Sequence, residues 1–426
     1  MFSPGTAQIL IFSIIGVSIV LMLIRPRRIA EAYWISGGVV LLLSLRLIDL
    51  PLAWHASGKA LDVCLFLIGM MLLCEMARAH GVFDWISAIA VRHAGGSGLK
   101  LFTLVYAVGA VVTIFMSNDA TAVVLTPAML TAVRKAKVQP LPYLFACAFI
   151  ANAASFLLPI SNPANLVVFH DAMPPLARWL TAFGIPCLLS IAITYFVLRW
   201  IYRRDLSASI GHAVDAVDLN RNGAFVLAGA AAMIAVLLTA SSFGKDLGLP
   251  TCLCALAILA VICIKERSNP LIFAREISWA TLLLVVGLFI MVDAAEKVGA
   301  MQYTNEALSW AQQMGATTGP LVTGSGVGIA NNFVNNLPLG LIVGHTVHVA
   351  HSSSPITDAV LIGVDLGPNL SITGSLATIL WLLALRKEAI DVSFWDFLKV
   401  GVIAMPLALL AALEGSIFLH AFLLGS

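Results

Sequence analysis

Long apolar stretches recur from one end of this chain to the other, and this feature most limits the possible folds. Of its 426 residues, 60% are hydrophobic and only 11% are charged, whereas a soluble protein carries roughly 25% charged residues. Ten segments are long enough to cross a hydrocarbon core of ~30 Å. They lie at about 8–24, 30–48, 60–78, 143–169, 181–200, 223–241, 249–264, 277–294, 357–385 and 398–423. The sequence therefore predicts an all-α, polytopic membrane protein.

The first apolar stretch has the character of a span and not of a removable leader. Residues 8–24 have no basic region before them and run directly into Arg25-Pro26-Arg27-Arg28. Basic residues after a span anchor it on the cytoplasmic side. We therefore expect a multi-pass protein of the bacterial cytoplasmic (inner) membrane, surrounded by the lipid bilayer.

Composition and motifs argue against several other classes. The net charge of +2 is too small to suggest a nucleic-acid partner. All seven cysteines lie in apolar segments without zinc-type spacing, which is typical of small buried side chains. The chain contains no Gly-x-x-x-x-Gly-Lys-Ser/Thr loop, so it is not expected to hydrolyse ATP itself. No cofactor and no resident metal are expected.

The distribution of lysine and arginine predicts the orientation. With the N-terminus outside, 19 of the 24 lysines and arginines fall in inner-side segments. The five on the outer side are Arg46, Lys59, Arg178, Lys245 and Lys297. Because cytoplasmic loops carry an excess of positive charge, this bias places both termini on the outer side.

Two further apolar stretches, at about 101–133 and 319–344, are too long for one span, and a polar cluster interrupts each of them. Lys100 precedes the first stretch and Arg134 follows it, so both of its ends lie on the inner side. The second stretch is flanked by outer-side segments of low charge. We therefore expect two re-entrant helical hairpins, one entering from each side.

Five spans and one hairpin form each half of the chain. The first half covers residues 1–202 and the second 223–426, with a cytoplasmic linker at 203–222. An odd number of crossings inverts the second half relative to the first. Inverted repeats with broken helices near the midplane are common in secondary carriers, whereas a channel or a membrane enzyme does not need them. The pattern therefore indicates transport.

Four polar clusters interrupt the apolar sequence, two in each half, at the hairpin tips and in the spans that follow them. Asn, Asp, Pro and Gly disfavour helix interiors, and non-helical backbone at membrane depth is tolerated only in a cavity or buried in protein. We expect the four clusters to form one substrate site, against the alternative that they only let helices pack closely. Its candidate residues are Ser117, Asn118, Asp119, Thr121, Ser161, Asn162, Asn165, Asn332, Asn335, Asn336, Asp365, Asn369, Thr373 and Ser375.

Two carboxylates and three histidines need separate interpretation. Asp119 and Asp365 lie within the polar clusters, and an intramembrane ionisable residue is a functional candidate. Both are candidates for proton coupling. Asp119 could instead cap a helix, and Asp365 could instead cap a helix or pair with a buried donor. His345, His348 and His351 are expected to lie in a solvated outer mouth, away from any carboxylate, and not to bind a metal.

Two motifs carry a resemblance to a known family. They are Ser117-Asn118-Asp119-Ala120 with Leu125-Thr126-Pro127, and Gly363-Val364-Asp365-Leu366-Gly367-Pro368-Asn369 with Thr373-Gly374-Ser375-Leu376-Ala377-Thr378-Ile379-Leu380-Trp381. The chain resembles the arsenite efflux permease family (ArsB) from its first span to its last. The enclosing superfamily has the same inverted-repeat, two-hairpin plan, and its members are thought to move a transport domain as an elevator against a scaffold domain.

The resemblance implies export of trivalent arsenic as neutral arsenite, and of antimonite. Amide and hydroxyl groups suit that cargo because they bind As–OH groups reversibly, whereas a cluster of thiolates would retain it. Protons are the expected coupling ion, through Asp119. Members of the family can dock a separate arsenite-stimulated ATPase subunit, and the sequence leaves open both this and the formation of a homodimer.

This chain differs at two positions from the family that it resembles. Some members carry an acidic residue where Asn152 stands and a lysine where Asn369 stands. The alternative function is a sodium/proton antiporter or a sodium-coupled anion carrier of the same superfamily. Dicarboxylate carriage is disfavoured because the polar clusters contain no arginine or lysine.

Overall fold

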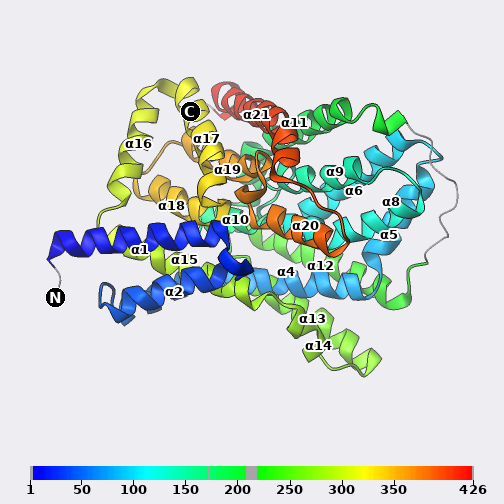
Figure 1. The fold of residues 1–426 in the computed structure, drawn as a ribbon, viewed down its shortest axis with the longest axis horizontal. Helices are drawn as coiled ribbons and strands as arrows, with labels where there is room; N and C mark the ends of the chain where they lie inside the picture. The colour runs from blue at the N-terminus through cyan, green and yellow to red at the C-terminus, as the bar shows by residue number, and fades with distance from the viewer. Residues whose placement is uncertain (1–2, 171–172, 208–217, 425–426) are drawn as a thin grey trace.

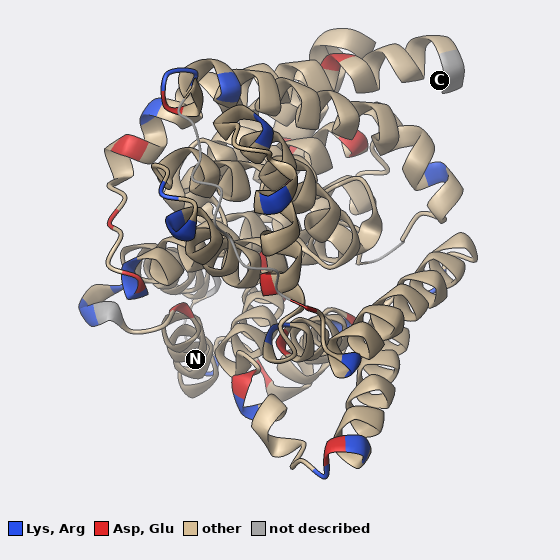
Figure 2. Cartoon of the chain, turned by 90° about the vertical axis from the view of Figure 1, so that its right-hand side faces the viewer, with Lys and Arg blue, Asp and Glu red and all other residues tan. Residues whose placement is uncertain are grey.

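The computed structural model describes residues 3–170, 173–207 and 218–424, and these residues form helices and loops without a strand. Part of the expected linker, 208–217, lies outside the described residues. The helices form two bundles that lie side by side (Figure 1). The charged residues are few and lie mostly near helix ends and connections, as expected for a chain that faces lipid (Figure 2).

The first bundle occupies the lower edge of Figure 1 and combines helices from the start and the middle of the chain. In it α4 packs on α13, and α15 packs on α2, α3 and α4. Its members are α1 (Pro4–Ile24), α2 (Glu31–Ser44), α3 (Leu50–Lys59), α4 (Leu61–Ala79), α12 (Arg221–Ser242), α13 (Gly248–Glu266), α14 (Leu271–Glu276) and α15 (Trp279–Lys297).

The second bundle contains both interrupted apolar stretches. From the first half it takes α5 (Val82–His93), α6 (Gly98–Phe115), α7 (Asn118–Ala120), the π-helical turn η2 (Thr121–Leu125), α8 (Thr126–Lys135), α9 (Leu141–Ala153), η3 (Pro159–Ser161), α10 (Pro163–Val168) and α11 (Leu176–Ile201). From the second half it takes α16 (Met301–Gln313), α17 (Gly315–Val334), α18 (Asn336–Val349), α19 (Ser354–Leu366), η5 (Gly367–Asn369), η6 (Ile372–Gly374), α20 (Leu376–Lys387) and α21 (Phe394–Leu419). Helices α11 and α21 pack along each other and join the two sets.

Within the described residues, seven helices are long and apolar enough to cross a membrane, and the bent pair α3–α4 makes an eighth. The all-helical membrane class is thereby confirmed. The difference from about ten expected spans has three sources. Helix α2 has only 14 residues, and the segments expected at 143–169 and 357–385 are each broken into short helices. Helix α6, expected as one arm of a hairpin, is itself long enough to count.

The first interrupted stretch folds back on itself after α6. Thr121, just past the turn, lies against α6, where its hydroxyl is 2.8 Å from the Thr113 hydroxyl and 3.4 Å from the Gly109 carbonyl. A continuous helix would separate residues 109 and 121 by about 18 Å along its axis. The chain therefore forms a helical hairpin, as expected for 101–133.

The second interrupted stretch also reverses direction, between α17 and α18. Gly319 at the start of α17 packs against Ala311 of α16. Thr346 lies near the end of α18, and its hydroxyl is 2.9 Å from the hydroxyl of Thr304, which also belongs to α16. A straight helix would place residues 319 and 346 about 40 Å apart. The expected hairpin at 319–344 is thus present, with arms that extend a few residues further.

Glycines allow one arm of this hairpin to approach α19 very closely. A Cβ on Gly363 would lie 2.5 Å from the carbonyl oxygen of Gly324, and one on Gly367 would lie 2.4 Å from that of Gly328. Small residues at such crossings let helix backbones pack in direct contact within a membrane. The approach fixes the second hairpin against the helix that carries Asp365.

Candidate transport site

Both hairpins turn at a single residue in a backbone region that is normally limited to glycine. Ser117 has φ 145° and ψ 163°, and Asn335 has φ 80° and ψ 152°. Each side chain caps the returning helix: Ser117 Oγ accepts from the Ala120 N–H (3.3 Å), and Asn335 Oδ1 accepts from the Leu337 N–H (3.4 Å). Such strained residues persist only where the surroundings impose them, and they cluster at functional sites.

The first broken span turns at η3 and resumes as α10. Pro159 begins η3, where its missing N–H and fixed φ suit the start of a short helix. Asn162 Oδ1 then caps α10 by accepting from the Ala164 N–H (3.0 Å). Ser161 Oγ donates to the Ile114 carbonyl near the end of α6 (2.8 Å), which ties this break to the first hairpin.

The second broken span follows α19 and is tied to the second hairpin. Ser371 Oγ donates to Asn332 Oδ1 (2.7 Å), and Thr373 Oγ1 donates to the Asn332 carbonyl (3.0 Å). Asn335 Nδ2 donates to the Thr373 carbonyl (3.3 Å). Ser375 ends the break as the cap of α20, accepting from the Thr378 N–H (3.1 Å). Each break is thus joined to the hairpin of its own half.

Asp365 joins the two halves of the arrangement. Its Oδ1 accepts from Asn162 Nδ2 at 2.6 Å, and the carboxyl group is completely buried. The helices after the breaks also cross over: α10 packs on α18 of the second hairpin, and α20 packs on η2 of the first. Polar contacts therefore join each hairpin to its own break, and the Asn162–Asp365 contact joins the two halves.

Several buried oxygen atoms of the tips and breaks have no hydrogen-bond donor among the described residues. They include Asn118 Oδ1 and Asn336 Oδ1, one residue beyond each hairpin tip, and Asp365 Oδ2 between the breaks. A buried oxygen without a donor is costly, so each such atom calls for an explanation. Asp119 is partly exposed and makes no hydrogen bond or ion pair with any described residue. No described lysine or arginine pairs with either aspartate.

Comparison with known proteins decides the family. The family model described as "Citrate transporter" matches residues 9–364, which is most of the chain. The chain belongs to the citrate transporter family. The protein is a transmembrane transporter, and its homologues are named as pumps and transporters.

Among the most similar curated relatives are proteins named "Arsenical pump membrane protein". The one from Escherichia coli (strain K12) is 26% identical over 92% of this chain and 94% of its own length. The one from Yersinia enterocolitica is 25% identical over the same shares. These matches confirm the resemblance to arsenite permeases. An uncharacterised transporter of Mycobacterium tuberculosis is 25% identical over 84% of the chain and 86% of its own.

A solved transporter structure shares the fold. The YdaH transporter of Alcanivorax borkumensis aligns with a TM-score of 0.57 and 14% identity, covering 87% of each chain. At this identity the likeness concerns the fold alone. It supports the overall fold of this citrate transporter family member.

Two of the candidate residues hold the breaks in shape with their amide nitrogens. Asn165 Nδ2 donates to the carbonyls of Ser155 (2.9 Å) and Leu158 (3.2 Å). Asn369 Nδ2 donates to the Phe149 carbonyl of α9 (3.0 Å). Both residues are buried. Their donors are therefore committed to the protein, and their contribution is to the backbone around the site.

Two asparagines outside the candidate set complete the framework. Asn152 of α9 donates through Nδ2 to Asn369 Oδ1 (2.9 Å), so the two amide positions that depart from the resembling family form one buried contact between the halves. Asn331 Nδ2 donates to the carbonyls of Gly363 (2.9 Å) and Val364 (2.7 Å). Neither partner is apparent from sequence, although an asparagine inside an apolar helix signals a buried hydrogen bond.

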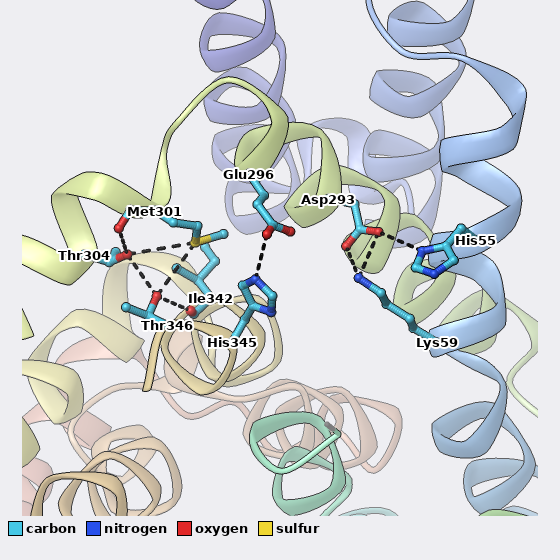
Figure 3. A network of polar contacts seen from close by, with 9 residues as sticks. All are labelled: His55, Lys59, Asp293, Glu296, Met301, Thr304, Ile342, His345 and Thr346. Carbon is cyan, nitrogen blue, oxygen red and sulfur yellow. Dashed lines mark hydrogen bonds and ion pairs between the residues drawn. The ribbon is translucent and has the colours of Figure 1, made fainter. Parts of the chain in front are cut away.

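The histidine interpretation needs one correction. His345 was expected to have no carboxylate neighbour, but its Nε2 lies 3.2 Å from a carboxylate oxygen of Glu296 at the end of α15. Figure 3 shows Glu296 and Asp293 on α15, the first directed to His345 of α18 and the second to Lys59 of α3. The reason is tertiary, because residues 49 positions apart meet where the two bundles touch. Among the described residues no group of three or more His, Cys, Asp or Glu side chains could hold a metal.

Replacing Asn335 with alanine should lower stability by about 2 kcal/mol, because both the helix cap and the bond to Thr373 are lost. Asn335→Gly loses the same side chain but relieves the positive φ, so it should remain closer to the wild type. Thermal unfolding of the purified protein in detergent measures both variants. If Asn335→Gly lost as much stability as Asn335→Ala, or more, the backbone at Asn335 would not be strained.

Proposed function

We propose that this transporter exports trivalent arsenic, as arsenite, and also antimonite, from the cytoplasm across the inner membrane. The observation that carries the proposal is the set of buried, donor-free oxygens at the tips and between the breaks, without a cationic side chain among them. Several relatives that match the chain over nine-tenths of its length are named arsenical pump membrane proteins. Protein oxygens that lack a hydrogen-bond donor suit a cargo that brings hydrogen-bond donors of its own.

The chemistry of arsenite fits such a site. As a neutral trihydroxide it brings three O–H donors and no net charge, which suits acceptor oxygens such as Asn118 Oδ1, Asn336 Oδ1 and Asp365 Oδ2. Release remains easy because hydrogen bonds are individually weak. The free cysteines of the described chain are dispersed in packed segments and offer no group of three thiolates that would trap arsenic.

The two bundles suggest how the site is exposed to each side in turn. Both hairpins and both breaks belong to the second bundle, so it can carry the complete site while the first bundle remains fixed in the bilayer. We propose an elevator movement of this kind, with the halves 1–202 and 223–426 as inverted repeats and both termini outside. Docking of a separate ATPase subunit and formation of a homodimer, which the resemblance suggests, are also proposals.

Protons are the proposed counter-ion, and Asp119 is the proposed carrier, because its carboxylate is partly exposed and has no partner among the described residues. Asp119→Asn should abolish uptake of arsenite into inverted vesicles when a pH gradient drives it. Counterflow exchange of arsenite should persist, since an amide still binds O–H groups. Glu414→Gln, an exposed carboxylate of the last span, is the matched control. Full gradient-driven uptake by Asp119→Asn would remove the proposed role.

A sodium-coupled carrier is the competing function, because oxygen atoms that lack donors are also ligands for sodium. The same site disfavours citrate, since no lysine or arginine pairs with its carboxylates or lies in its breaks. A strain without its own exporters separates the alternatives. Expression of this chain should restore tolerance to arsenite and antimonite and leave sodium tolerance unchanged. Restored sodium tolerance alone would favour the antiporter.

A further inference from the structure

A cavity of about 740 Å³ opens where two spanning helices end, away from the transport site. It lies between the start of α6 and the end of α11, and its wall includes Ser97, Leu99, Phe196, Arg199, Trp200 and Arg203. No candidate transport residue lines it. Its wall combines arginines with apolar side chains, unlike the acceptor-rich transport site.

The cavity lies at the level where a membrane meets water. Helices α6 and α11 are both long and apolar enough to span, and they run side by side. Tyr106 Oη donates to the Ile191 carbonyl (2.7 Å), and the hydroxyls of Tyr195 and Thr103 lie 2.8 Å apart. Because α6 begins and α11 ends beside the cavity, its mouth lies among lipid headgroups. The excess of arginine and lysine at this end assigns it to the cytoplasmic leaflet.

Two arginines give the wall of the cavity positive charge. Arg199 and Arg203 are exposed, and neither forms an ion pair with another described residue. The Arg203 guanidinium instead lies 5.5 Å from the centre of the Trp200 ring. The N-terminus of α6 adds partial positive charge to the same wall. Asp205, two residues after Arg203, is exposed and forms no ion pair with another described residue.

Apolar side chains flank this charge. Phe196 is 59% exposed and Trp200 57% exposed, both on the last turns of α11. Tryptophan at the end of a span typically lies at the headgroup level. Leu99 continues the apolar wall on α6. A ligand that fits both parts must be amphipathic, with an anionic group next to hydrocarbon.

We propose that this cavity binds the phosphate headgroup of an anionic phospholipid, with phosphatidylglycerol as the probe. Guanidinium groups bind phosphate oxygens in a two-pronged geometry, and basic pockets between spanning helices on the cytoplasmic side hold lipid headgroups. The acyl chains then lie along Phe196 and Trp200. A soluble phosphate would use the arginines but leave the apolar wall unused.

Native mass spectrometry of the full chain in detergent tests the site. Phosphatidylglycerol, phosphatidylcholine and inorganic phosphate are titrated separately, and the bound fraction of each is measured. We expect phosphatidylglycerol to bind with preference over the other two. Arg199→Gln with Arg203→Gln should weaken its binding about 30-fold, roughly fivefold for each charge. Lys135→Gln with Lys137→Gln, at the end of α8, should leave it unchanged.

A third double variant guards against misfolding. Arg199→Lys with Arg203→Lys keeps the charge, so it should recover most of the binding that the glutamine pair loses. Three results would overturn the proposal: equal binding of phosphatidylglycerol and phosphatidylcholine, equal loss in the control pair on α8, or binding of inorganic phosphate as tight as that of the lipid. The last result would assign the arginines to a soluble anion.

Discussion

Asp365→Asn should reduce arsenite transport roughly 10- to 150-fold, the range expected when hydrogen bonds to a charged group are lost. The carboxyl group is completely buried, and Oδ1 accepts from Asn162 Nδ2 at 2.6 Å. An asparagine can retain this bond, so the break should keep its shape. What changes is Oδ2, which has no hydrogen-bond donor among the described residues and would be replaced by an NH₂ that cannot accept.

The control for this prediction lies on the same helix. Asp358 is also buried, two turns before Asp365, but it pairs with His420 at 2.7 Å, at the other end of α19 from the breaks. Asp358→Asn should lower the amount of folded protein and leave transport per folded molecule near the wild-type value. Uptake is therefore normalised to monodisperse protein in detergent. Wild-type uptake by Asp365→Asn would exclude this carboxylate from the site.

Gly363→Val should destabilise the second bundle by about 3 kcal/mol or more, because overpacking at a rigid contact forces helices apart. A Cβ on Gly363 would lie 2.5 Å from the Gly324 carbonyl oxygen and 3.0 Å from Val327 Cβ. Backbone cannot move away from this contact without moving α17. Since α17 carries the tip of the second hairpin, we expect Gly363→Val to lose transport activity as well as stability.

Gly326 provides the matched comparison for Gly363. It is a glycine of α17 with open space around its would-be Cβ, so Gly326→Val should fold at the wild-type level. Expression and the thermal midpoint in detergent measure both variants. A Gly363→Val protein with unchanged midpoint would show that α17 and α19 are not in close contact.

The hairpins and the broken spans could be predicted because their cause is local. Asn, Asp, Pro and Gly weaken a helix wherever they occur, so apolar sequence interrupted by them indicates a break. Ser117 and Asn335 lie at the turns for this reason. The distribution of lysine and arginine also predicts that both ends of an interrupted stretch lie on the same side of the membrane. The number of continuous spans was harder to predict, because α2 ends after 14 residues, before the end of the segment expected at 30–48.

The partners inside the site could not be predicted, because they depend on tertiary packing. Asn162 meets Asp365 from 203 positions away, and Asn152 meets Asn369 from 217. Nothing near these residues in the sequence specifies the pairing. For the same reason Asn369, a substrate candidate by its place in a break, proves to be bonded to α9 through both its nitrogen and its oxygen. The sequence locates such groups at the site, but their contacts decide which remain free to bind cargo.

Uptake into proteoliposomes that contain only this purified chain tests the central claim most directly. Radiolabelled arsenite, citrate and sodium are offered in parallel under an imposed pH gradient, with protein-free liposomes as the blank. We predict gradient-driven accumulation of arsenite, competition by antimonite, and no accumulation of citrate or sodium above the blank. Accumulation of citrate or sodium without arsenite would contradict a site built for a neutral hydroxylated cargo.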